Sequence, residues 1–331
     1  MFRKSILAFI LSFSLVQIAL AEEKPTLTIY TYDAFAADWG PAPLLSAGFE
    51  KVCDCLVNWV AADSSIAMLR LAQLGGNAAR ADIILGLDTS ILAEAEKSNL
   101  FVKHEVDTSA LTVPNNWRSD EFVPFDYGYF AFVYNKEKLA NPPRSFKQLA
   151  AENSNFKIII QDPRSSTPGL GLMLWVKAAF GNDANEAWAE IAPHVLTMTR
   201  SWSESYSLFL KGEADMVLSY TTSPAYHLIA ENDKRFAAAK FREGQYLQVE
   251  VAGILKTSTN KQLARKFLAY LISPAAQKII PTTNWMYPVA KIDLPKGFET
   301  LIKPSRVLLL DAGEVAKNRS NWIKEMLGAF K

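Results

Sequence analysis

Apolar strands alternate with amphipathic helices early in the chain, and this alternation limits the possible fold more than any other feature. The segments 26–31, 56–61 and 81–87 are rich in β-branched and aromatic residues and predict strands. Between them, 41–52 and 66–74 carry apolar residues at helical spacing and predict helices. Nearly continuous apolar strands separated by helices are typical of a parallel sheet that is covered on both faces. We therefore predict an α/β fold with doubly wound sheets.

A second α/β unit follows, and two long segments connect it to the first. The segment 123–134 is too long for an ordinary strand, so we expect it to cross between two lobes. The segment 246–255 is placed to cross back. The expected lobes are 22–127 with 248–284, and 128–247 with 285–331.

The remaining elements are predicted from the same patterns. Hydrophobic and β-branched runs indicate strands, and helical periodicity after a capping residue indicates helices. The predicted strands are 156–160 and 214–219, and the predicted helices are one starting at Thr167 and those at 188–196, 262–272, 274–280 and 315–330.

The N-terminus has the three parts of a secretory signal peptide. Arg3 and Lys4 precede an apolar run at 6–18, and an A-x-A cleavage pattern ends at Ala21. The apolar run is shorter than the ~20 residues that a membrane-spanning helix needs. We therefore expect residues 1–21 to be removed and the mature chain to reach the periplasm.

Charge and cysteine content exclude several classes of protein. The net charge is +1, and removal of Arg3 and Lys4 makes it −1, so no long-range field favours nucleic acid or a membrane surface. Cys53 and Cys55 are the only cysteines, too few for a metal cluster or a disulfide scaffold. Export would permit a bond between them, and the sequence leaves open whether it forms.

A binding crevice is expected where the strands end. Ligands of open α/β sheets bind at the carboxyl ends of the strands. The loops at these ends carry polar residues in this chain. They are 32–33, 63–65, Asp88, 161–167 and 220–223.

The run S-S-T-P-G-L-G at 165–171 is the sharpest local motif. Ser166 and Thr167 precede a proline that suits the first turn of a helix, and the two glycines allow close backbone approach. Free N–H groups and the positive end of the helix dipole favour an anion such as phosphate. An ordinary helix cap is the alternative interpretation, and spacing alone does not exclude it.

Aromatic residues gather in the same polar loops. Rings stacked around a flat cation would form a cation–π box, although core packing is the better explanation for any single ring. Hydroxyl and amide neighbours favour loop contacts over core for these five residues, which are Tyr32, Trp202, Tyr220, Tyr226 and Trp285.

Catalysis has little support in the sequence. The three histidines are His104, His194 and His227, and no nucleophile elbow, HExxH or Walker pattern occurs. Cys53 and Cys55 lie between the first helix and the second strand, at the amino ends of the strands and away from the expected crevice. We expect no catalytic residue, no metal site and no cofactor.

Six segments carry a resemblance to a known family. The sequence resembles the periplasmic thiamine-binding proteins of Gram-negative bacteria over nearly the whole mature chain. The segments are 30–43 (YTYDAFAADWGPAP), 81–88 (ADIILGLD), 122–136 (FVPFDYGYFAFVYNK), 161–172 (QDPRSSTPGLGL), 218–227 (LSYTTSPAYH) and 281–290 (PTTNWMYPVA).

The resemblance implies a two-lobed type II periplasmic-binding-protein fold that clamps thiamine, its monophosphate or its diphosphate. It implies delivery to a membrane permease driven by a cytosolic ATPase. It also assigns roles to residues: Tyr32, Trp202, Tyr220 and Trp285 as aromatic walls, Ser166 and Thr167 on the phosphate side, and Thr221, Thr222 and Ser223 as a polar loop.

One position departs from the family pattern. The family has an acid, Asp and Gly after the second strand, and this chain has Asp63, Ser64 and Ser65. A carboxylate contact at position 64 is therefore lost unless Asp63 supplies it, and backbone contacts with Ser65 remain possible.

Two other functions remain open. The first is a receptor for iron(III) or a polyamine. Tyr220 is followed by Thr221, so the adjacent tyrosines of ferric receptors are missing, whereas Asp33, Asp63 and Asp88 could face a polyamine. The second is an enzyme resembling thiaminase I, which shares a similar fold and uses a cysteine nucleophile.

Overall fold

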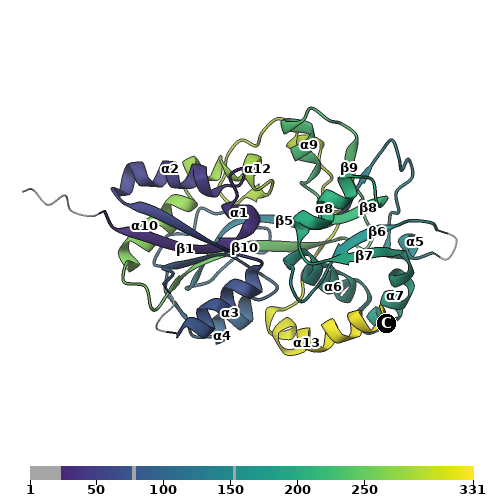
Figure 1. The fold of residues 1–331 in the computed structure, drawn as a ribbon, viewed down its shortest axis with the longest axis horizontal. Helices are drawn as coiled ribbons and strands as arrows, with labels where there is room; N and C mark the ends of the chain where they lie inside the picture. Colours follow the sequence, from purple (N-terminus) through teal and green to yellow (C-terminus); the bar gives the residue numbers. More distant parts are fainter. Residues whose placement is uncertain (1–23, 77–79, 152–153) are drawn as a thin grey trace, which may run out of the picture.

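The computed structural model describes residues 24–76, 80–151 and 154–331. The predicted signal peptide at 1–21 lies outside these residues. Figure 1 shows two groups of helices and strands side by side, joined by strands that run through the middle of the molecule. The strands of the main sheet lie side by side in the order β2 (Leu56–Ala62), β1 (Thr26–Tyr32), β3 (Ile83–Asp88), β10 (Gln245–Leu255), β5 (Phe122–Asn135), β8 (Met216–Tyr220), β6 (Ile158–Gln161) and β7 (Val195–Thr199).

The first lobe contains the predicted parallel unit. β1 (Thr26–Tyr32) pairs in parallel with β2 (Leu56–Ala62) and β3 (Ile83–Asp88). α2 (Ala42–Cys53) and α3 (Ser65–Gly75) connect these strands. All five elements match the sequence prediction to within two residues.

The second lobe repeats this pattern, with one correction. β6 (Ile158–Gln161) pairs in parallel with β7 (Val195–Thr199) and β8 (Met216–Tyr220). The helix expected at 188–196 is confirmed only as far as Ile191, because α7 (Ala184–Ile191) ends there and a short 3₁₀ turn leads into β7. β7 is only partly buried and begins two residues after Pro193. Its residues therefore form no clear strand pattern and resemble an extension of the preceding helix.

Two long strands cross between the lobes, as predicted. β5 (Phe122–Asn135) pairs with β10 (Gln245–Leu255) through its first half and with β8 through its second. β5 and β10 are antiparallel to each other, and β10 is antiparallel to β3. The sheet is therefore parallel within each lobe and mixed where the lobes meet.

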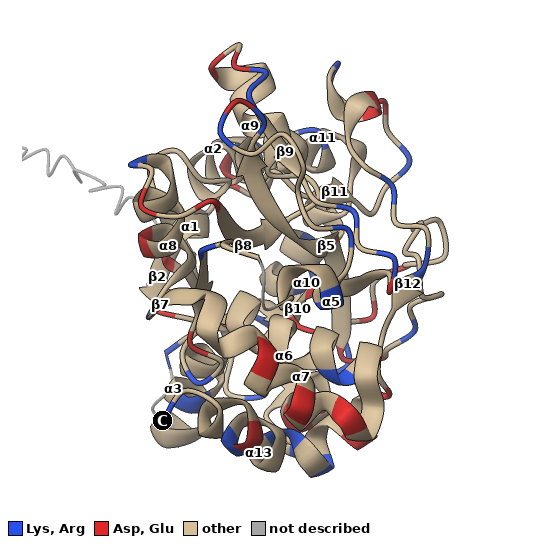
Figure 2. Cartoon of the chain, turned by 90° about the vertical axis from the view of Figure 1, so that its right-hand side faces the viewer, with Lys and Arg blue, Asp and Glu red and all other residues tan. Residues whose placement is uncertain are grey.

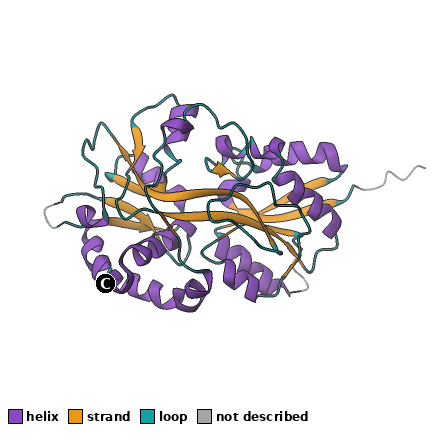
Figure 3. Cartoon of the chain, turned by 180° about the vertical axis from the view of Figure 1, so that it is seen from behind, coloured by secondary structure: helices purple, strands orange, loops and turns teal. Residues whose placement is uncertain are grey.

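Helices cover both faces of the strands in Figure 3. α6 (Thr167–Phe180) and α13 (Ala312–Gly328) pack against each other. α13 also contacts α4 (Leu92–Lys97) of the first lobe, where Arg319 pairs with Glu94. Val315, Trp322 and Met326 form its buried face, so the C-terminal helix touches both lobes.

The remaining elements are shorter or lie at the edges of the lobes. The helices are α1 (Asp33–Ala36), α5 (Phe146–Leu149), α8 (Trp202–Leu210), α9 (Pro224–Ala230), α10 (Lys261–Leu271), α11 (Pro274–Gln277) and α12 (Ile280–Thr283). The strands are β4 (Phe101–Val102), β9 (Phe236–Ala238), β11 (Tyr287–Pro288) and β12 (Val307–Leu308).

Three further features bear on the sequence predictions. Cys53 and Cys55 form a disulfide at the end of α2. Acidic and basic residues lie on the same elements in Figure 2, α13 among them, so neither sign dominates that helix. Within the described ranges, no helix combines the length and apolarity needed to cross a membrane.

Candidate functional site

A cavity of about 860 Å³ lies between the lobes, where strands from both sides end. Tyr32 is the last residue of β1, and Tyr220 is the last residue of β8. Eleven of the thirteen predicted site residues line this cavity: Tyr32, Asp63, Ser64, Ser65, Ser166, Thr167, Trp202, Tyr220, Ser223, Tyr226 and Trp285.

Thr221 and Thr222 are the two predicted residues that do not reach the cavity. Both are fully buried, and neither hydroxyl has a hydrogen-bond partner among the described residues. The backbone N–H of Thr221 donates to the Tyr129 carbonyl at 2.8 Å, which turns the chain beneath the end of β8. These residues shape the turn that presents Ser223, whose hydroxyl lies 2.7 Å from that of Ser219.

Trp202 and its neighbour Tyr206 form one aromatic wall. Their rings stack with centroids 5.0 Å apart, and the Trp202 Nε1–H donates to Ser219 Oγ at 2.8 Å. Trp202 is the first residue of α8, which Ser201 caps through its side chain. Sequence reasoning missed Tyr206, although its spacing of four residues from Trp202 places both rings on one helix face.

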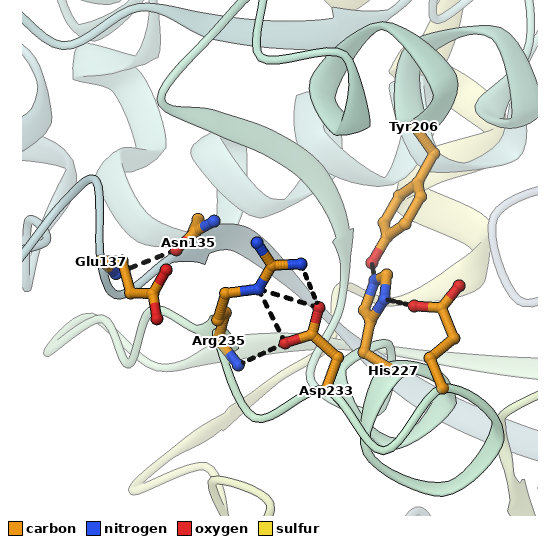
Figure 4. Close-up of polar contacts among 7 residues, drawn as sticks. Asn135, Glu137, Tyr206, His227, Asp233 and Arg235 are labelled. Atoms are coloured by element: carbon orange, nitrogen blue, oxygen red, sulfur yellow. Dashed lines mark hydrogen bonds and ion pairs between the residues drawn. The ribbon is translucent and has the colours of Figure 1, made fainter.

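Tyr206 is held from behind by a buried histidine. The Tyr206 hydroxyl lies 2.9 Å from His227 Nε2, and His227 Nδ1 lies 2.7 Å from Glu231 Oε2 (Figure 4). Burial lowers the pKa of His227, against the opposing effect of Glu231. A neutral ring that donates from Nδ1 and accepts at Nε2 fits these contacts. The histidine therefore supports the wall without touching the cavity.

A second wall comes from α9 and the turn after α12. Tyr226 meets Trp285 edge to face, with ring centroids 5.3 Å apart. Trp285 has φ of 56°, in the left-handed region that bulky residues rarely adopt. Such backbone strain is concentrated at functional sites, and here it turns an indole toward the cavity.

The start of α6 meets the first lobe at one end of the cavity. Ser65 Oγ lies 3.0 Å from Thr167 Oγ1, and Thr167 Oγ1 lies 3.3 Å from Asp88 Oδ2. Ser166 occupies the cap position of α6, yet its side chain makes no capping bond. The predicted close approach is present, since a Cβ on Gly169 would lie 2.3 Å from the Gln161 carbonyl oxygen.

The Asp63–Ser64–Ser65 segment is also placed at this end. The Asp63 carboxylate forms an exposed ion pair with Arg200 of the other lobe. Ser64 caps α3 by accepting from the Ala67 N–H at 3.3 Å, and Ser65 donates to the Gly86 carbonyl at 2.5 Å. Each of the three residues that differ from or adjoin the change in the family pattern thus has a hydrogen-bond or ion-pair partner of its own within the protein.

Sequence reasoning missed a buried carboxylate at the floor of the cavity. Glu250 of β10 lines the cavity and is only 6% exposed. It accepts from the Tyr32 hydroxyl at 2.8 Å and from Gln248 Nε2 at 3.0 Å. Asp126 lies opposite Glu250 in the register of β5 and β10 and is fully buried. Both are isolated charges in apolar strands, and that was the signal available in the sequence.

The described residues offer no group of three His, Cys, Asp or Glu side chains that could hold a metal ion. What the cavity presents is aromatic faces, hydroxyl groups, a helix start and a buried carboxylate. This set suits an organic ligand with a flat cationic part and an acceptor-rich tail.

Comparison with known proteins shows that the chain is similar to bacterial solute-binding proteins. The family model described as bacterial extracellular solute-binding protein matches residues 25–278. The thiamine-binding periplasmic protein of Escherichia coli is 53% identical over 302 residues, which are 91% of this chain and 92% of that protein. The protein of that name from Brucella suis is 49% identical over 98% of both chains.

Solved structures agree with the fold. A periplasmic thiamin binding protein superposes with a TM-score of 0.91 at 52% identity, covering 93% of this chain and 97% of that one. A ferric binding protein from Campylobacter jejuni reaches a TM-score of 0.77 at 18% identity over 92% of this chain and 99% of that one, a likeness of fold alone. The predicted two-lobed type II fold is confirmed.

Proposed function

Because the chain belongs to the family of bacterial extracellular solute-binding proteins, we propose that it binds thiamine, thiamine monophosphate and thiamine diphosphate and delivers them to an ABC importer. One observation carries this proposal. The cavity between the lobes combines aromatic walls with a hydroxyl-lined helix start at one end. That arrangement matches a flat cationic ring with a phosphate tail.

The aromatic walls hold the rings of the vitamin. Trp202, Tyr220 and Trp285 sandwich the thiazolium and pyrimidine rings together with Tyr32 and Tyr226. A cation over a desolvated aromatic face gains ~0.5–2 kcal/mol per contact. Ser65, Ser166 and Thr167 face the phosphate, whose charge the N-terminus of α6 favours.

The ligand bridges both lobes and so favours their closed arrangement. A ligand shifts such an equilibrium only through better contacts in one state. In the present arrangement Ser65 already meets Thr167, and Asp63 forms an exposed ion pair with Arg200 of the other lobe. The lobes we propose are 22–127 with 248–284 and 128–247 with 285–331, with hinges near Gly128 and Tyr246.

Location and partners follow from the same proposal. The signal peptide is cleaved after Ala21, and the mature chain acts in the periplasm. The closed form presents one face of each lobe to a membrane permease, and a cytosolic ATPase drives transport. The protein is a receptor without a cofactor and without catalytic activity.

The two rival functions have less support. The thiaminase-like alternative needs a cysteine nucleophile, whereas Cys53 and Cys55 are joined in a disulfide and do not line the cavity. The iron alternative lacks the adjacent tyrosines of ferric receptors, and the described residues contain no group of three His, Cys, Asp or Glu side chains that could hold a metal ion. A polyamine would use the acidic residues, so it is included in the test.

Isothermal titration with thiamine, its two phosphates, spermidine and ferric citrate tests the proposal. We expect tight binding of the thiamine compounds and no comparable heat from the other two. Replacing Trp202, Tyr220 and Trp285 together by alanine should weaken thiamine binding by about a hundredfold or more, because three stacking faces are lost. Tyr270→Ala, outside the cavity, is the control. Binding of only spermidine or iron, or full affinity in the triple variant, would contradict the proposal.

A further inference from the structure

Two facing carboxylates lie on the strands that cross between the lobes, and one of them, Glu250, is at the floor of the cavity. Asp126 and Glu250 are directly opposite each other in the antiparallel pairing of β5 and β10. Asp126 is fully buried, and its Oδ1 has no hydrogen-bond partner among the described residues. Glu250 is nearly buried and forms part of the cavity wall. Both carboxylates are therefore shielded from bulk water, and Glu250 faces the cavity.

The polar groups around the pair are neutral or acidic. From β1 and the turn after α12, the Tyr32 hydroxyl donates to Glu250 and Asn284 Nδ2 donates to Asp126 Oδ2 at 2.7 Å. Gln248 donates to Glu250 and accepts from the Tyr220 hydroxyl of β8 at 2.9 Å. Burial raises the pKa of both tyrosines well above the ordinary value, so they remain neutral donors.

In the described part of the chain, no basic side chain forms an ion pair with either carboxylate. Asp88 of β3, across from Glu250 in the sheet register, adds a third acid. Among the described ion pairs, none involves Asp88, Asp126 or Glu250. Lys211 lines the cavity and forms no ion pair with them. A buried negative charge without a basic partner is costly, and a cationic ligand would remove much of that cost.

The raised pKa values of the two carboxyls agree with their burial and with the absence of a basic partner among the described residues. Burial raises the pKa of Asp126 to about 7. Burial first, and then the charge of Asp126, raise the pKa of Glu250 well above its ordinary value. Two interacting carboxyls of this kind retain a proton between them when no cation is near.

We propose that Glu250 is the counter-charge that selects a positively charged ligand, and that the Glu250–Asp126 pair releases its proton when the cation binds. The proton passes to solvent, so one positive charge replaces another at the floor of the cavity. This inference rests on the proposed function, because it takes the thiazolium ring as the cation. Glu250 would thus select for the positive charge of the ligand, in addition to the contacts that the aromatic walls make.

Four probes and two variants test the counter-charge. The probes are thiamine, its neutral isostere with thiophene in place of thiazolium, oxythiamine, which keeps the charge but loses the amino group, and spermidine. The wild type should prefer thiamine to the neutral isostere by at least about tenfold, as expected for a buried charge contact. Glu250→Gln should remove most of this preference and leave affinity for the isostere unchanged. Glu243→Gln, in the same chain segment but hydrogen-bonded to the Phe146 N–H, is the matched control.

The pH dependence tests proton release. Between about pH 6 and about pH 8.5, wild-type affinity for thiamine should rise several-fold, because the proton no longer has to be displaced. Affinity for the isostere should not change with pH. Asp126→Asn should keep the preference for thiamine and move the rise in affinity to lower pH, because it removes a like charge from beside Glu250 while the burial of Glu250 remains.

The outcomes separate this inference from the proposed function. Unchanged preference in Glu250→Gln, or equal loss for thiamine and the isostere, would overturn the counter-charge. So would a loss confined to ligands that carry the amino group, with oxythiamine unaffected. If the wild type binds spermidine but no thiamine compound, and Glu250→Gln weakens spermidine, the proposed function fails and the counter-charge stands. Both fail if no cation binds.

Discussion

Trp202 shows how a single side chain can serve both the cavity and the fold. Its ring stacks on Tyr206, and its Nε1–H donates to Ser219 Oγ, which is fully buried at the end of β8. Ser219 in turn contacts Ser223, which lines the cavity. The indole therefore contributes an aromatic face and also holds the loop that follows β8.

Trp202→Ala and Trp202→Phe separate these two contributions. Phenylalanine keeps a ring but not the N–H, so we expect affinity for thiamine to fall about threefold to tenfold. Alanine removes the face as well, and the loss should reach about tenfold to a hundredfold. Titration calorimetry measures both, and Trp322→Phe on α13 is the control. Equal losses in the two variants would show that the ring face contributes nothing.

The missed residues also have an explanation at the residue scale. Asp126 and Glu250 interrupt apolar strands, which marks them as unusual, but only the pairing register places them opposite each other. Thr221 and Thr222 lie in a polar run that predicts exposure, yet the turn after β8 directs both side chains into the interior. The polarity of a residue does not determine whether its side chain points toward solvent or into the interior of the protein.

At the scale of elements, the disulfide joins the end of α2 to the start of β2. Cys53 is the last residue of α2, and Cys55 immediately precedes β2. Between them Asp54 has φ of 50° and ends the helix in the left-handed region. The bond therefore fixes a tight turn at the amino end of the sheet, opposite the cavity.

Replacing both cysteines by serine tests whether this turn matters for binding. The bond closes a very short loop, so its loss should lower the free energy of unfolding by only about 1–2 kcal/mol. Affinity for thiamine should not change, because neither cysteine lines the cavity. Denaturant unfolding and calorimetry measure the two quantities, with the reduced wild type as control. A large loss of affinity would mean that the turn is coupled to the site.

At the scale of the whole molecule, the Asp126–Glu250 pair links ligand binding, lobe connection and stability. The two strands that bear it are the central connection between the lobes. Natural proteins accept a local cost in stability at functional sites. The Asp126–Glu250 pair lowers the stability of the protein in this way, and the effect can be measured in the pH dependence of the free energy of unfolding.

Asp126→Asn should change the pH dependence of stability in a defined direction. The folded pKa of Asp126 is about 7 and the unfolded value is about 4, so the folded state binds more protons between them. The wild type therefore loses stability from this group as the pH rises from about 4 to about 7. Without ligand, the variant should be the more stable protein at pH 8 by about 1–3 kcal/mol, and the difference should shrink near pH 4.5.

Urea unfolding across this pH range measures the difference, and exposed Asp293→Asn is the control. Subtracting the wild-type curve removes the contribution of carboxyls whose pKa is lowered, such as Asp233 beside Arg235. A difference that stays constant with pH would show that Asp126 titrates normally.

The sequence alone determined the order of the main strands and helices, the two crossing segments and eleven of the residues around the cavity. These depend on local patterns: apolar periodicity, capping residues, and polar loops at the ends of strands. Tertiary structure decided the antiparallel pairing of β5 with β10, the strand at Val195–Thr199 and the inward direction of Thr221 and Thr222. It also brought Asp126 and Glu250 together across more than a hundred residues of chain. Strand pairing and burial depend on partners that are distant in sequence, so no local pattern could have specified them.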